Sequence, residues 1–234
     1  MHDSALTNAK RFFDAYGPQF PEGAVVLDIG SMDINGSIRN VCPSKFKYVG
    51  VDFASGNNVD YIMKDPYKVP AFDGTVDIVT ASSVFEHSAM FWLLFSDIMR
   101  VLKPNGLFYL NAPSNGAFHR HPIDAWRFYP DAAEALVTWS KHQGKNAAFL
   151  ESWFSKKGND GSAWNDFVSV FIADEQHVNQ YPNRMAFSIG EDNKPKWNVS
   201  AGDIYNGRFY GNPSHSILDL QNFPEGGQPP RATV

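Results

Sequence analysis

Residues 25–37 read Val-Val-Leu-Asp-Ile-Gly-Ser-Met-Asp-Ile-Asn-Gly-Ser, and they carry the clearest structural pattern in the sequence. It opens with an apolar, β-branched run that stops at Gly30, which predicts a buried strand followed by a turn. Residues 47–52, Lys-Tyr-Val-Gly-Val-Asp, form a second such run that ends on an acid. Helical patterns alternate with strand patterns along the chain, which predicts a mostly parallel sheet covered on both faces.

The spacing of apolar residues places the other elements. Helices are predicted at residues 4–16, 89–102 and 130–140, the second ended by Lys103-Pro104-Asn105-Gly106. Strands are predicted at residues 24–30, 47–52, 59–63, 76–81, 107–111, 147–154 and 166–172. No convincing helix separates the last two strands, so we expect them to pair antiparallel. The fold class is therefore α/β, with a Rossmann-like, seven-stranded, mostly parallel sheet.

Composition narrows the class of protein. The chain has 234 residues, a net charge of −5 and one cysteine, Cys42, so it lacks an internal disulfide and a basic surface for nucleic acid. No signal-peptide pattern or apolar run of membrane-spanning length is evident, which favours a cytoplasmic protein with no membrane partner. We expect a domain over residues 1–172. Residues 173–234, rich in proline, glycine and asparagine, are expected to be an irregular extension, packed on the domain or partly disordered.

The loop after the first strand indicates the ligand. Asp52 follows Gly30 by 22 residues, a spacing that suits a carboxylate on two ribose hydroxyls. A dinucleotide loop would have a second glycine where Met32 stands, and the acids Asp28 and Asp33 would repel a diphosphate. S-adenosylmethionine (SAM) combines an adenosine, a sulfonium and an ammonium group, and it fits these features. A nucleoside-diphosphate oxidoreductase is the disfavoured alternative.

Four ordered motifs resemble class I SAM-dependent methyltransferases. Residues 25–30 resemble their first motif, 49–52 their acidic second motif, 77–87 their fourth-strand segment and 100–107 the stretch before their fifth strand. A bacterial branch with Asp-x-Asn-Gly-Ser in the first loop is closer still. Its motif His-Arg-x-Pro-x-Asp-x-Trp-Arg-Phe-Tyr-Pro-Asp matches residues 119–131. Met32 and Ile34 depart from the general pattern, because they replace two loop glycines.

The resemblance implies a set of cofactor-binding residues. Gly30 would approach the methionine part, Asp52 would hold the ribose, and Ser82 would face the sulfonium. Asp65 would contact the adenine amino group, with the backbone N–H of Tyr67 as a second donor because Pro66 has none. The full predicted set is Asp28, Gly30, Ser31, Asn35, Asp52, Phe53, Asp65, Tyr67 and Ser82.

A hydroxyl acceptor needs a base, and histidine suits that task because an imidazole ordinarily titrates near neutrality. We predict His119 as the base, with His87 as the second candidate; Glu86-His87 could instead cap the following helix. His121, Asp124, Trp126 and Arg127 are predicted to contact the acceptor. His119, His121 and Asp124 could hold a metal, but the sequence offers them no third close ligand, so none is expected.

The expected function is SAM-dependent methyl transfer to a hydroxyl of a small polar or sugar/glycan acceptor. The aromatic content of 15% supports a ring-binding acceptor pocket, because residues 118–164 hold aromatics that strand or helix periodicity explains poorly. N-methylation of an amine metabolite and a non-catalytic SAM-binding scaffold stay open. An oligomer is also possible on the sequence alone.

Overall fold

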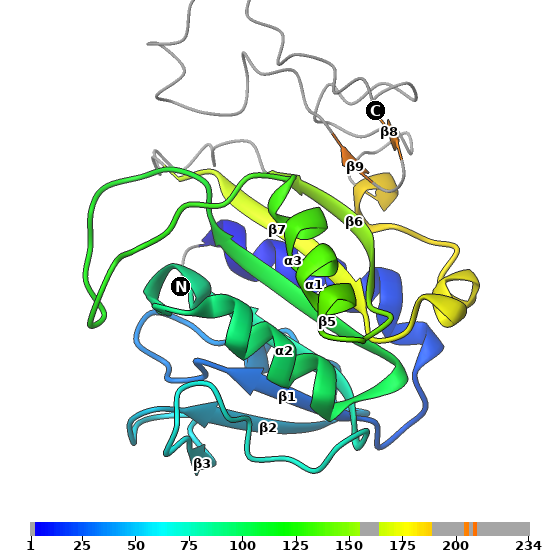
Figure 1. Cartoon of the computed structure of the whole chain (residues 1–234). Helices are drawn as coiled ribbons and strands as arrows, with labels where there is room; N and C mark the ends of the chain where they lie inside the picture. Colours follow the sequence, from blue (N-terminus) through cyan, green and yellow to red (C-terminus); the bar gives the residue numbers. More distant parts are fainter. Residues whose placement is uncertain (1–2, 155–163, 189–203, 206–207, 210–234) are drawn as a thin grey trace, which may run out of the picture.

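The computed structural model describes residues 3–154, 164–188, 204–205 and 208–209. One sheet runs through the molecule in the order β3-β2-β1-β4-β5-β7-β6-β9-β8. Strands β1 to β5 are parallel to one another, whereas β7 is antiparallel to both β5 and β6 (Figure 1). The antiparallel pairing of the last two predicted strands and the α/β arrangement of the seven predicted strands are therefore confirmed, and β9 and β8 extend the sheet beyond β6.

The predicted elements recur with small shifts at their ends. The helices are α1 (Asp3–Tyr16), α2 (Phe91–Val101) and α3 (Ala132–His142), with 3₁₀ helices η1 (Gly17–Gln19), η2 (Ile38–Asn40), η3 (Phe85–His87), η4 (Glu175–Gln180) and η5 (Met185–Ser188). The strands are β1 (Val25–Ile29), β2 (Lys47–Asp52), β3 (Tyr61–Ile62), β4 (Val76–Ser82), β5 (Leu102–Pro113), β6 (Ala148–Phe154), β7 (Asp166–Ile172), β8 (Ile204–Tyr205) and β9 (Arg208–Phe209).

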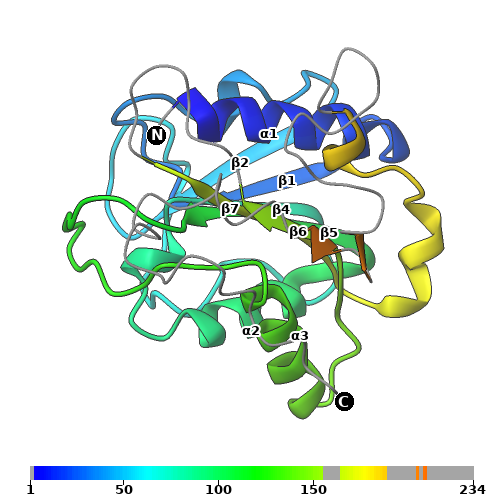
Figure 2. The same cartoon turned by 90° about the horizontal axis from the view of Figure 1, so that it is seen from above.

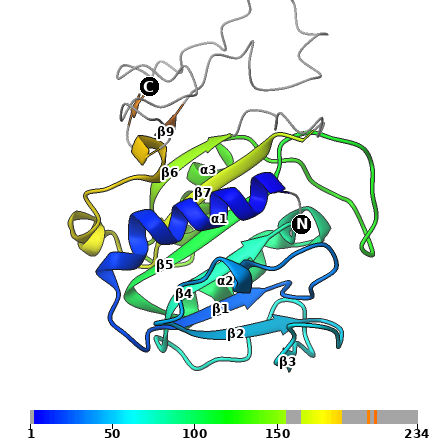
Figure 3. The same ribbon diagram turned by 180° about the vertical axis from the view of Figure 1, so that it is seen from behind.

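The helices cover both faces of the sheet, as the alternating pattern predicts. Figure 2 shows α1 on one face and α2 with α3 on the other, and Figure 3 shows α1 lying across the strands. Phe12 and Tyr16 of α1 pack with Tyr109 of β5 on the first face. Phe95 and Ile98 of α2 pack on the opposite face. Alternate side chains of one strand thus enter different cores, because successive side chains of a strand point to opposite faces.

One prediction about local structure was wrong. The second predicted helix ends at Val101, and β5 begins at once at Leu102, which pairs with Val76 before the register shifts. Residues 103–106, predicted to break the helix, therefore form a bulged part of the strand. The β1–β2 connection holds only the short helix η2, so the alternation of strands and helices is incomplete there.

Part of the predicted extension belongs to the core. The buried Glu151 carboxylate of β6 accepts the backbone N–H groups of Met185 and Ala186 at 2.8 and 3.1 Å. It also accepts the Tyr16 hydroxyl of α1. These bonds join η5 to the face that α1 covers. Most of residues 189–234 lie outside the described residues. Every helix in the described part of the chain falls short of the length and apolar character that crossing a membrane requires.

Candidate functional site

The carboxyl ends of the parallel strands β1, β2, β4 and β5 meet at one edge of the sheet, where doubly wound folds bind ligands. Gly30, directly after β1, has φ of +74°, and a Cβ there would lie 2.4 Å from Val84 Cγ2. Only glycine fits this close approach without strain. The backbone N–H groups of Gly30 and Ser31 both reach the carbonyl of Val51, at 2.9 and 3.2 Å. The first loop therefore folds tightly over the ends of β1 and β2.

Asp52, at the end of β2, organises the two loops beside it. Its buried carboxylate accepts the N–H of Met32 at 3.1 Å and the N–H of Ala54 at 3.2 Å. Each carboxylate oxygen can accept more than one hydrogen bond, so ribose hydroxyls can still bind there. The next residue, Phe53, is 62% exposed.

Asp28 is fully enclosed by protein groups. Thr80 Oγ1 donates to one oxygen at 2.6 Å and the Tyr48 hydroxyl donates to the other. Burial raises the pKa of Asp28 to about 6, against the lowering effect of these two hydrogen bonds. The two oxygens thus link β1 to β2 and β4 through hydrogen bonds. A direct cofactor contact from Asp28 stays a prediction.

The Asp33 carboxylate stabilises the rest of the first loop through hydrogen bonds. Its carboxylate accepts the N–H of Gly36 at 2.8 Å and the side-chain amide of Asn58 at 3.2 Å. The bond to Gly36, three residues on, closes a turn that leaves Asn35 exposed. Ser31 Oγ donates to the carbonyl of Asn58 at 3.1 Å. The predicted contact residues Ser31 and Asn35 therefore lie on a loop held by its own side chains.

A hydrogen bond joins Asp65 and Tyr67. The backbone N–H of Tyr67 donates to Asp65 Oδ1 at 2.8 Å, and Asp65 is exposed. Both were predicted to contact adenine separately. An adenine amino group could still use the Asp65 carboxylate, but the N–H of Tyr67 would have to leave its present acceptor first.

Buried polar atoms without partners gather where β4 and β5 end. Ser82 of β4 lies in register with Asn111 of β5. Among the described residues, Ser82 Oγ, Asn111 Nδ2 and the nearby Ser114 Oγ have no hydrogen-bond partner. Unsatisfied buried polar groups are costly, so their concentration at this edge fits a ligand that pairs with them. Together with the close Gly30 loop and the Asp52 carboxylate, they form a set of groups compatible with SAM.

The loop between β5 and α3, residues 114–131, carries the predicted acceptor residues (Figure 1). Asp124 Oδ2 accepts the backbone N–H of His119 at 2.8 Å and lies 3.4 Å from its ring Nδ1. Arg127 donates to both oxygens of Asp124, at 2.5 and 2.8 Å, and also to the carbonyl of Ala117 at 3.1 Å. The guanidinium lowers the pKa of Asp124 to about 2. Arg127 is thus engaged in shaping the loop, and its contact with an acceptor stays a prediction.

His87 lies beside His119, with ring centroids 4.9 Å apart. Its Nδ1 contacts the carbonyl of Ile123, which can only accept, so Nδ1 carries the proton and Nε2 holds the lone pair of the neutral ring. Burial lowers the pKa of His87. The helix-cap interpretation of Glu86-His87 is wrong, because α2 begins later, at Phe91, and its N-cap residue Met90 makes no side-chain bond.

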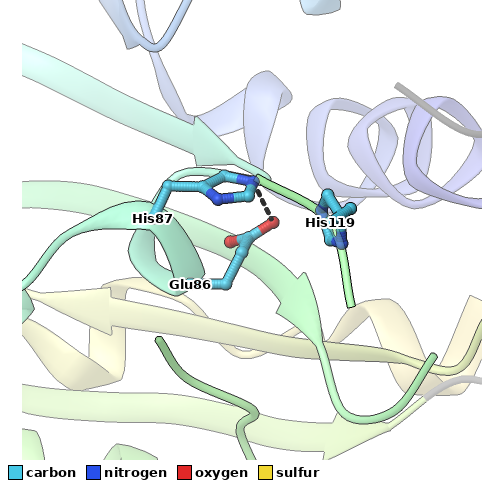
Figure 4. Close-up of side chains that lie close together, drawn as sticks. All are labelled: Glu86, His87 and His119. Carbon is cyan, nitrogen blue, oxygen red and sulfur yellow. Dashed lines mark ion pairs between the residues drawn. The ribbon is translucent and has the colours of Figure 1, made fainter. Parts of the chain in front are cut away.

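Glu86 has no role predicted from the sequence beyond the helix cap. It is 1% exposed, and its Oε1 lies 3.7 Å from His87 Nε2 (Figure 4). Desolvation raises the pKa of Glu86 to about 8. Glu86, His87 and His119 bring three ligand atoms within 4.8 Å of one another. Of the metal candidates considered from the sequence, His119, His121 and Asp124, only His119 belongs to this cluster. Glu86 and His87, from the η3 turn after β4, complete it.

The remaining predicted residues line the same loop. His121 is exposed, with its ring centroid 6.0 Å from that of His87. Trp126 is 37% exposed, and its Nε1 donates to the carbonyl of Ser88 at 3.0 Å. Trp164 stands edge-on to His119, with centroids 5.2 Å apart. By contrast, Phe128 is buried in the α2 core, so part of the aromatic excess is packing.

Comparisons with known proteins agree with this geometry. Residues 23–110 match the family model described as a methyltransferase domain. A protein of Mycobacterium leprae named an uncharacterized methyltransferase is 28% identical over 170 residues, which cover 65% of this chain and 61% of that protein. A Mycolicibacterium gilvum protein of the same description is 33% identical over 99 residues, 41% of this chain and 38% of its own. The chain thus spans less than two thirds of the length of these relatives.

Solved structures share the fold at low identity. A Burkholderia thailandensis 1,6-didemethyltoxoflavin-N1-methyltransferase, solved with S-adenosylhomocysteine, gives a TM-score of 0.57 at 14% identity, over 74% of this chain and 80% of that one. The YcgJ protein of Bacillus subtilis gives 0.54 at 13% identity, over 74% of this chain and all of that one. The fold is the Rossmann-like α/β fold of class I methyltransferases.

Proposed function

We propose that this chain, with a methyltransferase-domain match over residues 23–110 and a class I methyltransferase sheet, is a SAM-dependent methyltransferase that acts on a hydroxyl group. The acceptor we propose is a small polar molecule or a sugar. The observation that carries the proposal is the placement of His119. It stands on the loop after β5, at the edge of the sheet where Gly30, Asp52 and Ser82 also end their strands.

The residues at the strand ends would hold the cofactor. Asp52 would accept the ribose hydroxyls, and the unpartnered Ser82 Oγ is available to a polar group of the methionine part. Gly30 would let the loop backbone approach that part closely. When bound, SAM supplies an activated methyl carbon together with its leaving group. The chain's own task is to align an acceptor with that carbon and to keep water away.

His119 would remove the acceptor's proton. Its Nδ1 donates to the carbonyl of Ala117 at 3.1 Å, so Nε2 carries the lone pair of the neutral ring. Asp124 fixes the backbone of His119 and lies beside the same Nδ1, which sets the direction of the ring. His87 is the second candidate base, because its Nδ1 contacts the carbonyl of Ile123 and its Nε2 therefore carries the lone pair.

The aromatic side chains of the loop support a ring-shaped acceptor. Trp126 is partly exposed, and the more exposed Phe118 and Tyr129 flank it along the loop. Their faces can stack on a sugar or another ring while the polar groups read its hydroxyls.

The test is methyl transfer from radiolabelled SAM to matched panels of sugars, other hydroxylated compounds and amines. We expect label on a hydroxyl compound and a loss of about 100-fold or more in His119→Ala. Label on an amine that persists in His119→Ala would replace the proposal with N-methylation. SAM binding without transfer to any panel member would favour a binding protein instead.

A further inference from the structure

We propose that Glu86, His87 and His119 form a binding site for a divalent transition-metal ion such as Zn²⁺. Their ligand atoms lie within 4.8 Å of one another, and Glu86 Oε1 is 3.7 Å from His87 Nε2. Figure 4 shows Glu86 directed toward the imidazole of His87, with His119 facing them from the neighbouring loop. The three groups come from two segments of the chain, since η3 follows β4 and His119 follows β5.

The Glu86 carboxylate supports a ligand independently of this clustering. The residue is 1% exposed, and its Oε2 has no hydrogen-bond partner among the described residues. A buried carboxyl oxygen without a partner is costly, and native sites satisfy such atoms with a hydrogen bond or a cation. Arg127, the cation that acts on Glu86 over distance, already donates to both oxygens of Asp124. A metal ion at the cluster would satisfy the free oxygen.

Both histidines are oriented as metal ligands usually are. A ligating histidine typically donates its other ring N–H to a carbonyl or a carboxylate, which fixes the tautomer and leaves the ligating nitrogen free. Here His87 Nδ1 contacts the carbonyl of Ile123, and His119 Nδ1 donates to the carbonyl of Ala117 with Asp124 at 3.4 Å. The Nε2 atom of each ring is therefore the ligand.

The donor set selects the kind of ion. Two imidazoles and one carboxylate suit zinc and its first-row neighbours better than Mg²⁺ or Ca²⁺, which prefer oxygen ligands. Zinc bonds of about 2.0–2.2 Å place neighbouring ligand atoms about 3.4 Å apart. Ligand atoms that now lie up to 4.8 Å apart would therefore have to move closer when the ion binds. Three protein ligands leave a position open. If the proposed function holds, that position would take the acceptor hydroxyl and ease loss of its proton to solvent, and in the metal-loaded chain His119 would serve as a ligand in place of its role as base.

The site is tested by metal binding, with no need for turnover. Chelator-treated, tag-free full-length chain would be titrated with Zn²⁺ in a calorimeter and with Co²⁺ in a visible spectrometer. We expect one equivalent to bind, with the Co²⁺ absorption bands of a nitrogen and oxygen site. Glu86→Gln, which keeps the side-chain shape, and His119→Ala should each weaken Zn²⁺ binding about 100-fold or more.

His142→Ala is the matched control, because His142 is an exposed histidine at the end of α3. It should bind Zn²⁺ as the wild type does. Circular dichroism of each variant checks folding, and the wild-type titrations need no variant. Absence of a Co²⁺ spectrum in the wild type, or equal Zn²⁺ affinity in wild type and Glu86→Gln, would overturn the site. Methyl transfer that continues in the presence of chelator would then leave the proposed function standing. Zn²⁺ binding without SAM binding would support the site and reject the function.

Discussion

The carboxylate of Asp124 holds His119 at two places, since it accepts the backbone N–H at 2.8 Å and lies 3.4 Å from the ring Nδ1. Arg127 in turn donates hydrogen bonds to both oxygens of that carboxylate. The acceptor loop is therefore organised around a buried acid, and the direction of the proposed base depends on it.

Asp124→Asn should lower kcat for a hydroxyl acceptor at least about 10-fold, which is part of the ~10²–10⁴-fold that a general base contributes. The reason is loss of orientation, so Asp124 is a positioning residue. Steady-state kinetics should show KM changing much less than kcat. Asp14→Asn, which removes the exposed partner of Lys10, is the control. A rise in KM with unchanged kcat would instead assign Asp124 and Arg127 to acceptor binding.

His119→Ala should reduce methyl transfer to a hydroxyl about 100-fold or more while leaving the affinity for S-adenosylhomocysteine unchanged. The side chain sits on the acceptor loop, away from the first loop that would hold the cofactor. Single-turnover rates and calorimetry measure the two effects separately. A full rate in this variant would show that His119 is not the base. His87→Ala would then test whether His87 serves as the base.

Gly30→Ala and Gly144→Ala form a matched pair, because both glycines have φ of +74°. Each substitution should cost about 1–2 kcal/mol for the left-handed backbone. Only Gly30→Ala adds a clash, with its Cβ 2.4 Å from Val84 Cγ2, whereas nothing lies within 4 Å at Gly144. We expect a further loss of about 1–3 kcal/mol at Gly30 in denaturant unfolding. Val84→Ala should relieve it, and equal losses in the pair would contradict the close packing.

The buried Asp28 should make stability depend on pH. Its pKa is about 6 in the folded chain against 3.8 ordinarily, so between these values the folded state binds more protons than the unfolded state. The free energy of unfolding therefore falls as pH rises through this window, by an amount on the order of 3 kcal/mol. Asp28→Asn has no carboxyl group at this position, so its free energy of unfolding should not show this fall.

Urea unfolding at pH 4 to 7 measures the effect. The stability of Asp28→Asn relative to the wild type should rise across the window, whatever fixed offset follows from the changed bonds to Thr80 and Tyr48. Parallel curves for the two proteins would show that Asp28 titrates in the folded chain as it does in the unfolded one.

Much of the fold could be predicted from the sequence, because buried parallel strands leave apolar runs that end at glycine or acid. The range of β2 matched its prediction, and that of β7 did as well. The early start of β5 at Leu102 could not be predicted, since a Lys-Pro-Asn-Gly stretch ordinarily marks a turn. Here pairing with Val76 of the neighbouring strand outweighs that local preference.

The site was predictable only in part. Strand-end residues such as Asp52 and Ser82 follow from the topology, because parallel strands end at one edge. Glu86 gave no such signal. Its importance comes from burial and from a histidine 33 positions later in the chain, and neither is visible in local spacing. The bond between Asp65 and Tyr67 likewise depends on the path of an irregular loop.

Binding of SAM at the strand ends is tested most directly by calorimetric titration of the full chain with S-adenosylhomocysteine and, separately, with NAD. We expect one equivalent of S-adenosylhomocysteine to bind, no comparable binding of NAD, and about 10-fold or more loss of affinity in Asp52→Asn, which weakens a charge-assisted bond to the ribose. Failure of S-adenosylhomocysteine to bind the folded wild-type chain, or tighter binding of NAD, would show that this edge of the sheet is not a SAM site.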